Sequence, residues 1–294
     1  MKGRILGVYL SKNIIPSASL NFLCDNLVEN YIGGVWSFAY GDGTTEPDLT
    51  DTALENEIDS FTSLYLTQQG RFLSIRNYLG SEEANGSNIR EAGLISAPSA
   101  ASSGGQSTDV LLARSVLPES IAKTSGISIT TIWRFEAIPA ADSFFTLYGL
   151  GWLLRRAFDP LIEERVYRYA MGTTPLAAFN KQEDEVKAYQ IVTNFTSYNV
   201  SGATVHIDAD FGTGEGNGST YTFAALLPET TEKFIAIDDG ISIAKTVSNS
   251  IDADWEITLA NLTFSYDRSI HSGAGRDTDA STRSLVIRPG IGAP

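Results

Sequence analysis

The apolar residues of the chain recur with two different periods, and each period predicts a different kind of element. After Pro16, apolar residues follow at spacings of three and four, at Leu20, Leu23, Leu27 and Tyr31. Such spacing predicts an amphipathic helix, which the glycines at 33 and 34 would end. The other apolar segments are shorter, and many of them alternate with polar residues, as strands do. The pattern therefore predicts a mainly β chain with a short helix near its start.

Turn residues divide the rest of the first half into strands. Residues 35–40 are apolar or small at every position, so we expect a strand that is buried on both faces or lies at an interface. Further strands are expected at 61–67, 72–79, 91–95, 110–115 and 127–137. In the last of these, Trp133 falls on a face with Ile127 and Ile129, which indicates a side directed into a core.

A repeat organises the chain. The tetrapeptide Ile-Ala-Lys-Thr stands at 121–124 and again at 243–246, and each copy is followed nine residues later by a tryptophan, Trp133 or Trp255. Seven of the thirteen positions from 121 to 133 are identical to those from 243 to 255. Upstream, residues 40–45 match residues 169–174, which aligns Gly43 with Gly172. Self-similarity over this length indicates one domain copied in tandem.

The expected fold is therefore mainly β, with two tandem, internally duplicated β-sandwich-like domains, each with a short helix near its start. The first domain would cover residues 1–140 and the second residues 141–264, followed by an extended C-terminal arm over 265–294. The repeat marks a set of expected structural anchors: Trp133, Trp255, Lys123, Lys245, Gly43 and Gly172.

Two segments outside the repeat are candidates for contacts with another chain. Residues 137–160 are too apolar for a linker, because they include Phe144, Phe145 and Trp152. They would pack the two copies together or meet another chain. The C-terminal arm ends in a short apolar strand around Ile287, which would either add to a neighbour's sheet or close its own domain.

The composition limits which partners the protein is expected to bind and in which compartment it is expected to be made. The net charge of −14 repels phosphate backbones, so we expect no nucleic-acid partner. Cys24 is the single cysteine, which excludes an intramolecular disulfide. The apolar part of the N-terminus, residues 5–10, is too short for a signal peptide. The stretch 144–158 carries two arginines and is too short to span a bilayer. We expect synthesis in a cytoplasm, without export or membrane insertion.

Candidate chemistry is sparse. His206 lies in an alternating segment and is expected to be an ordinary strand side chain. Residues 212–218 have the glycines of a phosphate loop, but a strand and not a helix follows, so a turn is expected. Asp208, Asp210 and Glu215 could offer oxygen ligands to calcium, although their spacing fits no EF-hand. We assign no catalytic, cofactor-binding or metal-binding residues and do not expect an enzyme.

Three motifs follow one another in the first copy. They are Tyr40-Gly-Asp-Gly-Thr-Thr-Glu-Pro with the acidic run to Glu57, then Ile89-Arg-Glu-Ala-Gly-Leu94, then Leu111-Leu-Ala-Arg114 with the segment 121–135. In this order they resemble a segment of structural proteins of tailed bacteriophages. The resemblance implies a virion protein of a tail, baseplate, collar or fibre, without catalytic residues. The second copy keeps the Gly-Thr-Thr and Ile-Ala-Lys-Thr anchors and lacks the other two motifs.

The expected function is therefore assembly in the tail region of a virion, with other virion proteins as partners. We expect a homo-oligomer, a trimer or a hexamer, because two similar domains per chain would let a trimer present six similar faces and join sixfold to threefold symmetry. The alternative is a tail-fibre adhesin that binds a host-surface glycan through the loops 97–108 and 212–218.

Overall fold

The computed structural model describes most of the chain as strands around two helices. The described residues are 13–28, 34–35, 37–62, 64–80, 82–96, 109–125, 127–139, 145–159, 164–173, 189–238, 241–247, 250–261 and 281–289. The elements of the first half are β1 (Asn13–Ile14), α1 (Ser17–Val28), β2 (Ser37–Gly41), β3 (Glu57–Phe61), β4 (Leu64–Gln69), β5 (Phe72–Leu79), β6 (Asn88–Ser96), β7 (Val110–Ala122) and β8 (Ile129–Pro139). The mainly β prediction is confirmed.

The second half begins with the other helix. Its elements are α2 (Leu147–Phe158), β9 (Val166–Gly172), β10 (Ile191–Asn194), β11 (Ser197–Ser201), β12 (Thr204–Phe211), β13 (Ser219–Tyr221), β14 (Phe223–Pro228), β15 (Ala236–Asp238), β16 (Ile243–Lys245) and β17 (Ile251–Asn261). The last described strand is β18 (Ser281–Pro289). Both helices are short, and each lies near the start of its own half, as expected.

Each half is a sandwich of two sheets. In the first half, a sheet ordered β1-β7-β6-β2-β3 packs on β4, β5 and β8. In the second half, β10-β9-β14-β15 packs on β11, β12 and β17. The strands β4, β5, β8, β18, β17, β12 and β11 are continuous, so they form one sheet of seven described strands across both halves. The sandwich-like class predicted from the alternation is therefore present.

The two predicted tryptophan anchors occupy matching core positions. Trp133 pairs with Ile75 across β8 and β5, and Trp255 pairs with Ile207 across β17 and β12. Both indoles are buried, at 2% and 3% exposure. Each meets an aromatic ring of the facing sheet edge-on, with centroids 6.4 Å from Phe38 and 6.2 Å from Tyr169. The two tryptophans therefore have similar packing surroundings.

The alignment of Gly43 with Gly172 is wrong by two residues. Gly172 ends β9 opposite Phe223, and the strand position that corresponds to it, opposite Glu91, is held by Gly41. Gly43 lies beyond β2, in the loop that leads to β3. A shift of two residues keeps every side chain on the same face of a sheet, so the alternating pattern could not detect it.

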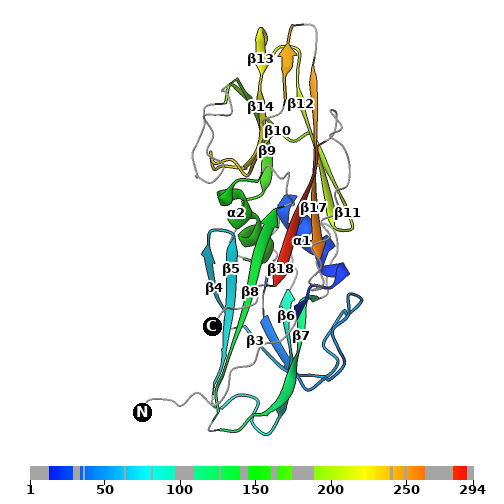
Figure 1. Cartoon of the computed structure of the whole chain (residues 1–294), viewed down its shortest axis with the longest axis vertical. Helices are drawn as coiled ribbons and strands as arrows, with labels where there is room; N and C mark the ends of the chain where they lie inside the picture. The colour runs from blue at the N-terminus through cyan, green and yellow to red at the C-terminus, as the bar shows by residue number, and fades with distance from the viewer. Residues whose placement is uncertain are drawn as a thin grey trace.

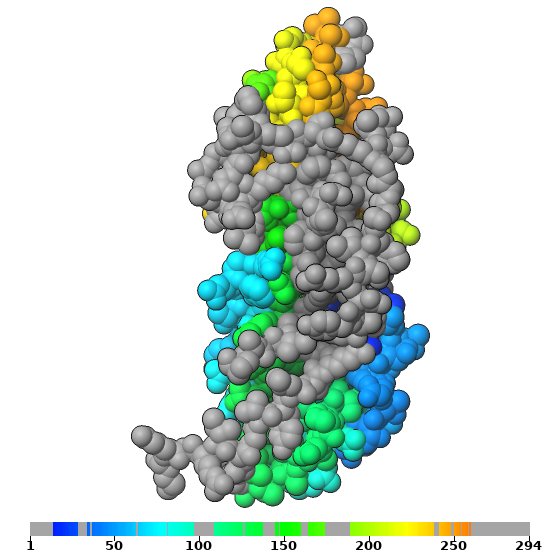
Figure 2. All heavy atoms as spheres, viewed as in Figure 1, coloured from blue at the N-terminus to red at the C-terminus, as the bar shows by residue number. Residues whose placement is uncertain are grey.

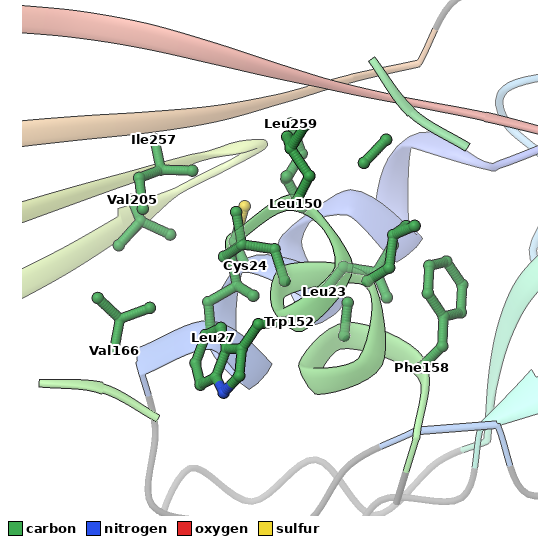
Figure 3. Packing of buried hydrophobic residues seen from close by; sticks show 14 of the residues in the cluster. Leu23, Cys24, Leu27, Leu150, Trp152, Phe158, Val166, Val205, Ile257 and Leu259 are labelled. Atoms are coloured by element: carbon green, nitrogen blue, oxygen red, sulfur yellow. The ribbon is translucent and has the colours of Figure 1, made fainter. Parts of the chain in front are cut away.

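The helices are exchanged between the halves. Helix α1 contacts β7 of its own half but also β11, β12 and β17 of the second half, and α2 contacts β4, β5 and β8 of the first half. The helices also contact each other, and the Asn26 side-chain amide donates to the carbonyl of Ala157 at 3.1 Å. Figure 3 shows Leu23 and Cys24 of α1 beside Leu150 and Trp152 of α2, with Leu259 of β17 nearby. The core is therefore shared by both halves.

This exchange decides between the alternatives for the apolar segment after residue 137. Phe145 and Trp152 are buried inside this chain, so they are not exposed assembly residues. Phe158 stacks on Phe135 of β8 with ring centroids 4.4 Å apart. The segment packs the two halves together because its large rings fill the space between the sheets. Phe144 lies outside the described residues.

The C-terminal arm also contributes to the chain's own fold. Strand β18 is parallel to β17 and antiparallel to β8, and its Ile287 lies between Asn261 and Ala137 in the register. It therefore connects the sheets of both halves, whereas we expected it to add to a neighbour or to close a single domain. Strands β17 and β8 flank β18 and run in opposite directions, so the two halves have opposite orientations along the strand direction.

The molecule is elongated, with the two halves stacked end to end (Figure 1). The loop after β12 lies at one end, beside β13, and the ends of β7 and β8 lie at the other. The space-filling view in Figure 2 shows the same long outline, with second-half residues at the upper tip and first-half residues at the lower end. The opposed direction of the halves places equivalent loops at opposite ends.

The start of α2 makes a close contact with the backbone of Ile235, and a substitution at this contact tests how closely the helix packs there. Thr146 caps the helix by accepting from Gly149 N, and a Cβ added at Gly149 would lie 1.9 Å from the carbonyl oxygen of Ile235. Alanine normally stabilises a helix interior by about 1 kcal/mol relative to glycine. Here the backbone contact should outweigh that gain, so Gly149→Ala should lower the free energy of unfolding by about 2 kcal/mol in urea titrations.

The matched control is Gly212→Ala. A Cβ at Gly212 would meet nothing within 4 Å, so its effect should stay within about 0.5 kcal/mol. Equal effects of the two substitutions would contradict the close docking of α2.

Candidate functional site

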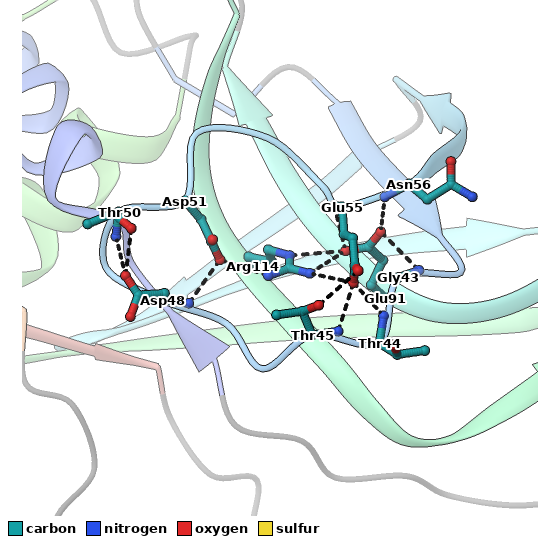
Figure 4. A network of polar contacts seen from close by, with 10 residues as sticks. All are labelled: Gly43, Thr44, Thr45, Asp48, Thr50, Asp51, Glu55, Asn56, Glu91 and Arg114. Atoms are coloured by element: carbon teal, nitrogen blue, oxygen red, sulfur yellow. Dashed lines mark hydrogen bonds and ion pairs between the residues drawn. The ribbon is translucent and has the colours of Figure 1, made fainter.

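The most extensive polar cluster of the first half is built around a buried ion pair. Arg114 of β7 donates from Nε to the Glu91 carboxylate of β6 at 3.0 Å, and its Nη2 lies 2.9 Å from the same oxygen. Both side chains are almost completely buried. Figure 4 shows the pair beside the loop that joins β2 to β3. The buried charges are compensated by each other and by this loop.

Glu91 holds the loop through its backbone. The carboxylate accepts hydrogen bonds from the backbone N–H groups of Gly43 at 3.2 Å, Glu55 at 3.1 Å and Asn56 at 2.8 Å. These donors come from both ends of the loop. A carboxylate that accepts several backbone N–H groups in this way fixes the path of the chain around it.

Two further carboxylates complete the cluster. Asp51 accepts from Arg114 Nη1 at 2.8 Å. Glu55 accepts from the backbone N–H of Thr45 at 2.7 Å, from its hydroxyl at 2.8 Å and from Thr44 N at 2.6 Å, and these bonds lower the pKa of Glu55. Burial opposes the charge of Arg114, but its bonds to Asp51 and Glu91 outweigh burial and raise the pKa of the guanidinium.

The second half has an apolar cluster at the corresponding place. Phe223 stands where the first half has Glu91, and Ile237 pairs with Ala225 where Arg114 pairs with Gly93. Phe223 and Ile237 are buried together with Phe234. A buried ion pair can be replaced by well-packed apolar residues without loss of stability. The first half fills this place with an ion pair, and the second half fills it with apolar side chains.

The two predicted lysine anchors adopt equivalent buried positions at the ends of the molecule. Lys123 Nζ lies 3.2 Å from Asn85 Oδ1, and Lys245 Nζ lies 3.1 Å from Asn217 Oδ1. In each case Nζ also donates to the backbone carbonyl of the threonine that follows the lysine. Each lysine therefore ties its strand to a loop that connects two sheets, β5 to β6 in the first half and β12 to β13 in the second.

The glycines of these loops match as well. Gly86 and Gly218 follow the two asparagines and have φ angles of 86° and 85°. Their backbone N–H groups donate to the carbonyl oxygens of Lys123 and Lys245, at 2.9 and 2.8 Å. Only glycine adopts this φ readily, so the Asn-Gly-Ser turn and the Ile-Ala-Lys-Thr strand form one local unit in each half.

The remaining sequence candidates are not brought into one site. His206 and Asp208 lie on an exposed face of β12, and the Glu215 carboxylate accepts from Gly212 N at 3.2 Å within its own loop. Asp210 shares a hydrogen bond with Asp252 of β17, which raises the pKa of Asp210. No cluster of three or more acidic, histidine or cysteine residues suited to a metal ion occurs within the described ranges.

The sequence analysis did not identify the buried ion cluster. One signal was present, because Arg114 interrupts an otherwise apolar strand and a buried guanidinium requires a carboxylate partner. Identifying Glu91 and Asp51 as those partners required the register of β6 on β7 and the path of the loop.

Comparison with known protein families, with curated proteins and with solved structures returned no match to this chain. Among the helices that the structure describes, neither α1 nor α2 is long and apolar enough to cross a membrane.

Proposed function

We propose that this protein is a structural protein of a tailed-bacteriophage virion, assembled in the tail, baseplate or collar. One observation supports this best: the three motifs of the resemblance meet in the cluster around Glu91. The first motif supplies Gly43 and Thr45, the second supplies Glu91 and the third supplies Arg114. In this chain, the residues of the pattern hold a loop in place, which is a structural role.

The same cluster favours assembly over catalysis. Its carboxylates are engaged by backbone N–H groups, hydroxyls and a guanidinium, so they serve to fix the loop. A general acid or base would need a carboxyl poised to exchange a proton near neutral pH, whereas Glu55 has a lowered pKa. We accordingly propose no enzymatic activity, no cofactor and no nucleic-acid partner.

The repeated core, turn and lysine geometry supports a tandem duplication of one fold. A trimer of such chains would present six similar halves, and we propose that it joins sixfold to threefold symmetry in the tail region. Native mass spectrometry of the purified protein tests this role. A trimer or hexamer is expected, and a stable monomer, tetramer or pentamer would rule it out.

The location on the particle tests the main proposal. Immunogold labelling of intact virions with an antibody against this chain should mark the tail region, and mass spectrometry of purified tails should detect the chain. Absence of the chain from purified particles would contradict a structural role in the virion.

A second candidate function is host-surface glycan binding by a tail fibre. The observation in its favour is the exposed loop 212–218 at one end of the molecule, since a terminal loop is well placed to touch a surface. The loop 97–108 lies outside the described residues. Replacing residues 213–215 should abolish binding on a glycan array, while the matching change at 81–83 should not. No glycan binding by the intact chain would exclude this function.

A further inference from the structure

The seven-stranded sheet has one covered face and one exposed face. Along β5, the residues Leu73, Ile75 and Leu79 point into the core, while their neighbours point outward. Along β12, Val205 and Ile207 do the same. Both helices contact the covered side, and they contact each other. The outward positions of both halves therefore belong to one continuous surface, which we call the outer sheet face.

In the first half, the outer sheet face is basic and apolar. Arg76 of β5 and Arg134 of β8 are exposed on it, and the half-buried Glu136 of β8 is paired there with Arg71. Tyr65 lies opposite Arg76 on β4, and Ile132 lies opposite it on β8, with 68% and 57% of their surfaces exposed. Tyr78 is also exposed on this face. Neighbouring exposed apolar side chains of this size are a feature of interaction surfaces.

In the second half, the same face is acidic. Its exposed or half-exposed residues include Asp208 and Asp210 of β12, and Asp252 and Glu256 of β17. Asp210 stands directly opposite Asp252. Directly opposed like charges destabilise a strand pair, so this arrangement has a cost within the isolated chain. A positively charged surface placed against it would remove that cost.

The opposite charges occur at equivalent positions. Arg76 directly follows Ile75, the partner of Trp133, and Asp208 directly follows Ile207, the partner of Trp255. Arg134 and Glu256 directly follow the two tryptophans. The two halves thus share a backbone register and differ in the sign of the charge that they present outward. The outer sheet face is therefore complementary to itself.

We propose that the outer sheet face binds the same face of a second copy of this chain, with the basic half of each copy on the acidic half of the other. Because the two halves are stacked along the strand direction, a twofold axis across the strands places unlike halves together. A twofold axis parallel to the strands would place like halves together, and repulsion disfavours it. The contact is isologous, so both copies use the same residues.

The dimensions suit a stable contact. Seven staggered strands at about 4.8 Å spacing, each about 8 residues long, present on the order of 800 Å² per copy. That is the area of a standard protein interface. Tyr65, Tyr78 and Ile132 supply apolar area for burial, and the charges set the orientation. A second copy fits better than an unrelated partner because the chain itself carries both complementary surfaces.

This inference does not depend on the virion role. It would, however, supply the twofold contact that converts two trimers into a hexamer. Sedimentation velocity of the full chain at low and high salt measures the self-association directly. We expect copies to pair at low salt and to dissociate as salt screens the charges.

Charge reversal tests the surface itself. The double variant Arg76→Glu with Arg134→Glu makes both halves acidic, and Asp252→Lys with Glu256→Lys makes the acidic half basic. Each variant alone should pair about a hundredfold more weakly than the wild type, and a mixture of the two should form heterodimers of wild-type strength. A variant that had simply misfolded would not be rescued by mixing.

Three results would overturn the proposal: a wild type that never pairs at low salt, variants that associate as well as the wild type, or a mixture that fails to pair. The outcomes also separate it from the symmetry role. A trimer unaffected by charge reversal would exclude only this contact. A charge-sensitive dimer that forms nothing larger would exclude only the symmetry role.

Discussion

Replacing Glu91 with alanine should lower the free energy of unfolding by about 3–5 kcal/mol, because Arg114 would remain buried without its main partner. The backbone N–H groups of Gly43, Glu55 and Asn56 would lose their acceptor as well. Urea denaturation followed by tryptophan fluorescence measures the loss. We expect a lower midpoint together with a looser loop between β2 and β3.

The exposed pair of Arg71 and Glu136 is the control for this substitution. Its atoms approach to 2.7 Å, but Arg71 is 43% exposed, so Arg71→Met should cost no more than about 1 kcal/mol. A double variant that copies the apolar cluster of the second half, Glu91→Phe with Arg114→Ile, should recover part of the loss. If Glu91→Ala costs no more than the surface control, the cluster does not stabilise the fold.

Separating the halves should abolish cooperative folding of each. A fragment of residues 1–144 would lack α2, which packs on β4, β5 and β8, and a fragment of residues 145–294 would lack α1, which packs on β11, β12 and β17. Each sheet would then expose apolar residues that the intact chain covers. In urea titrations followed by circular dichroism, we expect a cooperative transition for the intact chain and for the mixed fragments, and none for either fragment alone.

Cys24 offers an independent readout of the same prediction. It is fully buried in α1, and burial raises the pKa of its thiol to about 12. A neutral and covered thiol reacts slowly, so labelling at pH 8 should be slow in the intact chain and fast in the fragment 1–144. Adding the fragment 145–294 should slow it again. Cooperative unfolding and slow labelling of the fragment 1–144 alone would show that the helices need not be exchanged.

Much of the local structure could be predicted from the order of residue types. The helix after Pro16 and the alternating strands appear where the pattern placed them, and Trp133 and Trp255 are buried. The reason is physical: a period of two or 3.6 directs apolar side chains to one side, and that side is buried in any compact fold. The expected strand 61–67 failed in part, since β3 and β4 belong to different sheets.

The site was harder to predict. Lys123 and Lys245 were expected as anchors from the repeat, but the asparagines that bind them lie 38 and 28 residues away along the chain. Arg114 required an acidic partner, and the loop offered several carboxylates. Which of them became buried depends on how strands and loops cross in space, and this is not encoded in the spacing of neighbouring residues.

The sequence by itself determined the mainly β class, the position of most strands and the buried face of each, because these depend on local alternation and turn chemistry. Only the tertiary structure decided that Gly41 corresponds to Gly172, that the helices are exchanged and that β18 joins the two sheets. The physical reason is that a period-two pattern is unchanged by a two-residue shift and carries no record of which sheet a helix will cover.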